Sequence, residues 1–175
     1  MDSGTPHREE PVMRNNASHY DRVGRSLPSD SDRRLTLTPP NENDWETGEV
    51  DGAWLSYSDD LDYEAPDLVA ALSRRLGPID RVLYRLDEWQ KAPRRVTVGA
   101  RRIHLDGYRF QPHHTLGVRT RDGDSVTLLV VPPLMSGLAA QVVLHGAGQR
   151  GNTETVQQLL GLTLTDASGS SIEDK

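Results

Sequence analysis

The chain has no cysteine among its 175 residues. This absence excludes disulfide bonds, thiolate nucleophiles, iron–sulfur clusters and cysteine-ligated zinc sites. No apolar run approaches the roughly 18–20 residues that a membrane-spanning helix needs, and the charged segment 1–25 has no apolar stretch of the kind found in secretory signals. We therefore expect a soluble, cytoplasmic protein without a membrane partner.

Aromatic residues are also scarce, at 5% of the chain, and hydrophobic residues of all kinds reach 35%. Any core is therefore small and mostly aliphatic. Residues 1–33 and 163–175 contain almost no periodic apolar residues, so burial there cannot offset the entropy cost of ordering the backbone. We predict that these two segments are disordered tails. Between them we predict one folded domain at 34–162, which at roughly 130 residues is long enough for a self-supporting core.

The common sequence motifs of catalysis and cofactor binding are missing as well. The chain contains no glycine-rich dinucleotide-binding fingerprint, no phosphate-binding P-loop, no zinc-protease H-E-x-x-H, no calcium-binding EF-hand loop and no G-x-S-x-G nucleophile elbow. These absences favour a binding protein over an enzyme without excluding an enzyme. The sequence accordingly indicates no catalytic residue, no metal ligand and no cofactor.

What the sequence does contain is the pattern of an α+β domain. Apolar residues at helical spacing, with Pro66 in the first turn and Gly77-Pro78 as the stop, predict a helix at 66–76. At the end of the run 126–131, the residues that would point to either face of a strand are all apolar, which indicates a central strand. Because successive strands are joined by short turns, we predict an antiparallel meander of about five to six strands with two to three helices packed on one face. The expected strands are 34–38, 79–86, 94–98, 101–106, 114–120 and 125–131, and the later helices are 134–146 and 153–160.

Charge is unevenly distributed along the chain. Residues 34–73 hold ten acidic residues and one arginine, whereas residues 74–109 hold ten basic and four acidic residues. In one interpretation, the two blocks neutralise each other across the folded surface. In another, the acidic segment 42–64 folds back over a basic face and covers it.

The basic block contains a predicted hairpin with a two-residue turn, Gly99-Ala100. This turn places Val96 opposite Ile103 and Arg95 opposite His104. Strand alternation then puts Val96 and Ile103 on the core side. The opposite face collects the candidate binding residues, which are Arg95, Arg102, His104, Asp106 and Tyr108.

Two interpretations of this face compete. As a binding face, its paired arginines would grip phosphates or carboxylates, and Tyr108 would stack on a base. Alternatively, strand alternation simply places polar residues in water on the exposed side of a half-buried sheet. Our first hypothesis is a non-enzymatic binding or regulatory module whose anionic partner is RNA or an acidic protein surface.

The second hypothesis is a small-molecule-binding protein or enzyme with a pocket around His104, Asp106 and His114. The sequence places no nucleophile beside His104, so a catalytic triad is not indicated. His113 and His114 are adjacent, and in a strand they would point to opposite faces and not share one metal ion. Most of the large aromatic residues of the folded region are expected as core anchors or as lids over the sheet ends; these are Trp54, Trp89 and Phe110.

Five segments carry a further signal when they are taken in order, namely Val50–Trp54, Leu76–Tyr84, Pro93–Gly99, Leu105–Tyr108 and Thr127–Pro133. Together they resemble a family of small, mostly actinobacterial proteins that is conserved as a domain of unknown function. The resemblance covers residues 34–162 and implies a single cytoplasmic domain with an accessory role. It supplies no reaction, ligand or catalytic residue. The chain departs from the family pattern at 55–61, where a second tryptophan, a proline and basic residues are usual.

Overall fold

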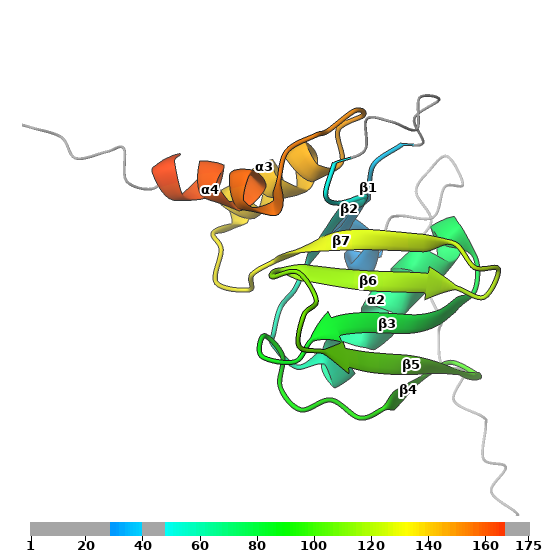
Figure 1. The fold of residues 1–175 in the computed structure, drawn as a ribbon. Helices are drawn as coiled ribbons and strands as arrows, with labels where there is room; N and C mark the ends of the chain where they lie inside the picture. The colour runs from blue at the N-terminus through cyan, green and yellow to red at the C-terminus, as the bar shows by residue number, and fades with distance from the viewer. Residues whose placement is uncertain (1–28, 40–47, 167–175) are drawn as a thin grey trace, which may run out of the picture.

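The computed structural model describes residues 29–39 and 48–166, with side chains as far as residue 161. The described chain forms one sheet and four helices (Figure 1). None of these helices has both the length and the apolar composition needed to cross a membrane. The helices are α1 (Asp30–Arg33), α2 (Leu61–Leu76), α3 (Gly137–Ala147) and α4 (Val156–Asp166). The strands are β1 (Leu35–Leu37), β2 (Gly52–Leu55), β3 (Ile79–Arg85), β4 (Arg95–Val98), β5 (Arg101–Tyr108), β6 (Thr115–Thr120) and β7 (Ser125–Val131).

The sheet is mixed, and its seven described strands lie in the order β1-β2-β7-β6-β3-β5-β4. Two neighbouring pairs are parallel, β2 with β7 and β3 with β5, and the other pairs are antiparallel. The predicted α+β class is confirmed. The predicted antiparallel meander is wrong, both in strand number and in strand direction.

The strand that breaks the predicted meander is β3. A meander would pair β3 with β4, but the connection 86–94 is too long for a tight turn, and it carries Trp89 into the core. β3 lies instead between β5 and β6, parallel to β5. The predicted hairpins β4–β5 and β6–β7 do form, because a tight turn leaves no room for another strand between its two partners.

Helices cover both faces of the sheet, so the prediction of helices on one face is wrong as well. Successive residues of β7 show this. Leu128 and Val130 belong to the core cluster that contains α2, whereas Leu129 and Val131 belong to the cluster that contains α3 and α4. β7 lies between β2 and β6, as its apolar run predicted. At the end of β7, the residues that point to either face are apolar because each face of this strand is covered by a helix.

Helix α2 begins earlier than its sequence signals predict. Asp60 is its N-cap, and the Asp60 carboxylate accepts a hydrogen bond of 3.0 Å from the backbone N–H of Asp62. Pro66 therefore lies inside the helix rather than in its first turn. The predicted end is confirmed, because Gly77 follows the last helical residue with a φ of 82°, a conformation that glycine adopts without strain.

Helix α1 lies in a segment that we expected to belong to the N-terminal tail, and side chains hold it against α2. Arg74, in the last turn of α2, donates to the Asp32 carboxylate at 2.6 Å and to the Ser29 hydroxyl at 3.0 Å. Burial raises the pKa of Asp32, but hydrogen bonds from Arg74 and Ser29 outweigh it and hold the pKa below its ordinary value of 3.8. The rest of the expected N-terminal tail lies outside the described residues, and so does the chain beyond residue 166.

Asp32→Asn is expected to lower the free energy of unfolding by less than about 1 kcal/mol at neutral pH, because the ion pair with Arg74 is near the surface. A carboxylate whose pKa falls on folding stabilises the fold above its unfolded pKa, and this contribution is lost as the pH falls through the folded pKa. The difference between Asp32→Asn and the wild type should therefore vanish as the pH drops below 3.8. Urea unfolding at neutral and acid pH measures this difference in the free energy of unfolding. A difference that persists in acid would contradict the ion-pair interpretation.

Candidate functional site

The sheet face opposite α2 is divided into two halves. Helix α3 packs over β1, β2 and β7 on this face (Figure 1). On β6, β3, β5 and β4, the same face carries mainly polar and charged side chains, none of which belongs to the described core clusters. We call this half the open face. It consists of Arg81, Leu83, Arg85, Arg95, Thr97, Arg102, His104, Asp106, Tyr108, Gly117 and Arg119.

All five predicted binding residues lie on the open face. The register of the β4–β5 hairpin is the predicted one, with Arg95 opposite His104 and Val96 opposite Ile103. Val96 and Ile103 are buried in the cluster that contains α2, as strand alternation predicted. Among the five candidates, His104 and Asp106 are half-buried and the other three are exposed.

Strands β3 and β6 add arginines that the sequence analysis missed. Parallel pairing puts Arg81 of β3 beside His104 and Arg85 beside Tyr108. Antiparallel pairing puts Arg119 of β6 on the other side of Arg81. They were missed because the predicted meander did not place β3 between β5 and β6. Arg81 and Arg85 lie four residues apart in β3, so the sequence does place them on the same face of that strand. The sequence does not show which strands lie beside β3, and the arginines therefore could not be assigned to the open face.

Among the described residues, ion pairs hold some of these arginines and not others. Arg81 Nη1 lies 3.0 Å from Asp106 Oδ2, and Arg85 Nε lies 2.6 Å from Asp87 Oδ1. The remaining arginines of the open face form no ion pair with any described residue; they are Arg95, Arg102 and Arg119.

No ion pair between described residues joins the acidic block 34–73 to the basic block 74–109. The acidic residues Glu64 and Asp67 of α2 are paired with Arg34 on the other side of the sheet. From residue 48 onward, the segment that we considered as a cover forms β2 and the start of α2. Within the described residues, the open face therefore keeps its positive charge.

A hollow of about 820 Å³ lies at the edge of the open face, where β5 runs beyond the end of β4. Pairing with β4 ends at His104, and the connection 86–94 bows away from the last residues of β5 (Figure 1). The Leu86 N–H donates to the Tyr108 carbonyl at 3.0 Å and closes one end. Of the five candidates, Arg102 lies outside the hollow. Its lining is Tyr84, Leu86, Ala92, Pro93, Arg94, Arg95, His104, Leu105, Asp106, Gly107 and Tyr108.

The groups that line the hollow are suited to recognition. Burial and the nearby Asp106 carboxylate raise the pKa of Tyr84, so its hydroxyl stays protonated at neutral pH and can donate a hydrogen bond. Arg81 holds one oxygen of Asp106 and leaves the other oxygen as an acceptor. Gly107 permits the close packing of this region, because a Cβ there would lie 3.0 Å from both Leu86 Cγ and Tyr84 Cζ.

His114 does not join His104 and Asp106, so the predicted three-residue pocket does not form. The Glu88 carboxylate instead accepts the backbone N–H of His114 at 2.9 Å and bonds to His113 Nδ1 at 2.7 Å. His114 lines a separate hollow of about 100 Å³. The described residues contain no group of three or more histidine, aspartate or glutamate side chains that could hold a metal ion.

The three aromatic residues expected as anchors or lids, Trp54, Trp89 and Phe110, do not all behave in the same way. Trp54 and Trp89 are buried core anchors, as predicted. The prediction is wrong for Phe110, which is 96% exposed just after the end of β5. The amino-acid type alone does not show whether an aromatic ring is buried or exposed. That depends on whether the chain at that position faces the core, which only the fold decides.

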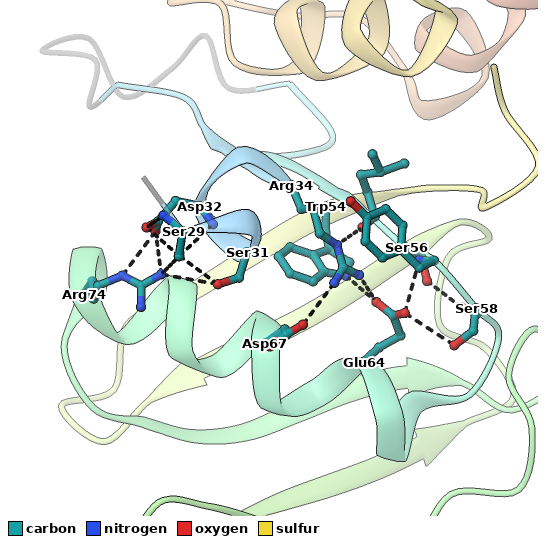
Figure 2. Close-up of polar contacts among 12 residues, drawn as sticks. Ser29, Ser31, Asp32, Arg34, Trp54, Ser56, Ser58, Glu64, Asp67 and Arg74 are labelled. Carbon is teal, nitrogen blue, oxygen red and sulfur yellow. Dashed lines mark hydrogen bonds and ion pairs between the residues drawn. The ribbon is translucent and has the colours of Figure 1, made fainter. Parts of the chain in front are cut away.

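A second polar cluster lies on the α2 side of the sheet (Figure 2). Arg34, which is 2% exposed, forms ion pairs with Glu64 and, at 3.2 Å, with Asp67. Its guanidinium lies between the rings of Trp54 and Tyr57, at 4.3 Å and 3.9 Å from the ring centroids. Glu64 also accepts hydrogen bonds from the Trp54 indole and the Tyr57 backbone. Because these groups satisfy one another, we interpret the cluster as a structural joint between β1, β2 and α2.

The pairing of Arg34 with Glu64 was not predicted from the sequence. Both sit in the acidic block, and a charged residue beside a strand or in the first turn of a helix is ordinarily a surface residue. A buried ion pair between residues 30 positions apart leaves no local pattern that would reveal it.

Comparison with known proteins gives a family and no activity. Neither the curated proteins nor the solved structures include a significant match. The profile of a family of unknown function (DUF5994) matches residues 34–147, which include all seven strands of the sheet. The matched residues include the strands that carry the open face, and the chain belongs to this family of unknown function.

Proposed function

We propose that the protein is a binding module that engages an anionic partner through the open face. The observation that supports this proposal most directly is the set of exposed arginines without an ion-pair partner among the described residues. A guanidinium offers a fork of donors that fits a phosphate or carboxylate with two hydrogen bonds. These arginines are Arg95, Arg102 and Arg119, each from a different strand.

The sheet gives these side chains a defined spacing. They project from hydrogen-bonded strands, which lie roughly 4.8 Å apart, rather than from loops. Because these strands are already ordered, binding a partner costs little free energy for ordering the backbone of this protein. Arg81 is already oriented by Asp106, and it extends the same surface toward β6.

The overall net charge of −6 is compatible with an anionic partner. Interactions between exposed charges are largely screened beyond about 10 Å at 0.1 M salt, and the acidic start of α2 lies on the opposite side of the sheet. The local excess of arginine therefore determines what the open face attracts. Binding of this kind weakens strongly as the salt concentration rises.

The double variant Arg95→Glu/Arg102→Glu is expected to weaken binding of a short labelled RNA by more than about tenfold at low salt. The slope of log affinity against log salt should also become shallower by about 2, since each lost arginine removes one phosphate contact. Both residues are exposed, so the fold should be unaffected. Fluorescence anisotropy of the full chain at about 50 and 200 mM salt measures both quantities, with heparin and a polyglutamate peptide as additional probes.

The matched control is Arg33→Glu/Arg150→Glu, which makes the same change in net charge at exposed positions on α1 and after α3. This variant should bind like the wild type. If the two double variants lose binding equally, affinity follows net charge and the open face has no special role. If none of the three probes binds the wild type at low salt, the proposal is wrong.

A further inference from the structure

We infer that the anionic partner is a single-stranded nucleic acid, one of whose bases stacks on Tyr108 at the hollow beside the end of β5. This inference rests on the proposed function and adds the class of ligand. Arginine alone does not distinguish a nucleic acid from an acidic protein, because it binds phosphate and carboxylate alike. The distinction comes from what surrounds the arginines.

Large apolar side chains near the end of β5 are exposed. Tyr108 and Leu86 are each 47% exposed, and the Leu86 N–H donates a hydrogen bond to the Tyr108 carbonyl. Phe110 follows two residues later and is almost fully exposed. Exposed aromatic rings next to arginines form the platform on which unpaired bases stack, since every base has a π-face.

The charges in the hollow are arranged in a way that suits a nucleotide. Arg94 and Arg95 line it from the β4 side and can meet a phosphate. Asp106 and His104 line it from the open face of β5. The free oxygen of Asp106 can accept a hydrogen bond from a base N–H, a donor that nucleotides carry and the ionised side chains of aspartate and glutamate lack. The volume of about 820 Å³ lies within the range typical of small-ligand sites and can hold a base and its sugar.

The bound strand must be single. In a duplex, the faces of the bases are stacked on one another and are not available to a side chain. Tyr108 lines a hollow and belongs to β5 of the sheet, and not to a helix that could enter a groove. We therefore expect the stacking contact to add affinity for a single strand and none for a duplex of the same sequence.

The test uses the full chain, a short labelled single-stranded RNA and the matching RNA duplex, followed by fluorescence anisotropy at low salt. Tyr108→Ala should weaken binding of the single strand by about tenfold, in line with the loss of one base–aromatic stack, and leave duplex binding unchanged. Tyr108→Phe should restore single-strand binding, because the ring and not the hydroxyl makes the contact. Tyr63→Ala is the matched control, since Tyr63 is 66% exposed on α2, away from the open face. A DNA strand of the same sequence, measured in parallel, shows which nucleic acid binds more tightly.

The outcomes separate this inference from the proposed function. If Arg95→Glu/Arg102→Glu abolishes single-strand binding and Tyr108→Ala leaves it unchanged, the inference is wrong and the proposed function stands. If the polyglutamate peptide binds through the same arginines and neither RNA binds, the partner is an acidic protein and the inference is again wrong. Circular dichroism of each variant confirms that a loss of binding is not a loss of fold.

Discussion

Glu64→Ala is expected to lower the free energy of unfolding by about 3–5 kcal/mol, because it leaves the Arg34 guanidinium buried without its main partner. Glu64 lies on the α2 side of the sheet and is almost fully buried. It also accepts hydrogen bonds from the Trp54 indole and the Tyr57 backbone N–H. Removing it therefore leaves several donors unsatisfied in addition to one charge. Urea unfolding followed by circular dichroism measures the loss.

Asp67→Ala provides the matched control for Glu64→Ala. Asp67 pairs with the same guanidinium, but its side chain is 57% exposed, so we expect a loss below about 1 kcal/mol. Combining Arg34→Met with Glu64→Leu removes both charges at once and should cost less than Glu64→Ala alone. Equal losses for Glu64→Ala and Asp67→Ala would show that burial of the ion pair does not matter and would contradict this account.

Gly52→Ala is expected to destabilise the fold by about 1–3 kcal/mol or more, as overpacking of a rigid site does. A Cβ at this position would overlap the carbonyl oxygen of Thr36 and lie 2.9 Å from the Cα of Leu37. Both obstacles are backbone of β1, which pairs with β2 at this point, so neither can move without breaking the β1–β2 ladder. Thermal and urea unfolding would both register the change.

Gly137→Ala is the control for Gly52→Ala. Gly137 is the first residue of α3, and a Cβ there would meet no atom within 4 Å. Alanine is also a better helix former than glycine, so the substitution should be neutral or slightly stabilising. If the two variants lose the same stability, the loss arises from glycine's backbone freedom in general and not from the close approach of β1.

The sequence by itself determined the local parts of this protein. The two-residue turn at Gly99-Ala100 set the register of the β4–β5 hairpin, and alternation then placed Arg95 and Arg102 on the exposed face. The apolar run of β7 predicted an interior strand, and Gly77 marked the end of α2. Each of these features depends on residues close together in the chain, where periodicity and turn chemistry carry the information.

Only the tertiary structure decided how these parts combine. Local patterns do not say which strand lies beside which, because strands of similar pattern can pair equally well until helices and connections select one arrangement. The insertion of β3 between β5 and β6 brought Arg81 into the open face, and the end of β4 pairing left a hollow beside Tyr108. The burial of Arg34 with Glu64 likewise depends on the start of β1, the end of β2 and the start of α2 meeting at one point. Such contacts join residues that are far apart in the sequence, so they stabilise the protein only after the chain has folded and cannot be predicted from local patterns.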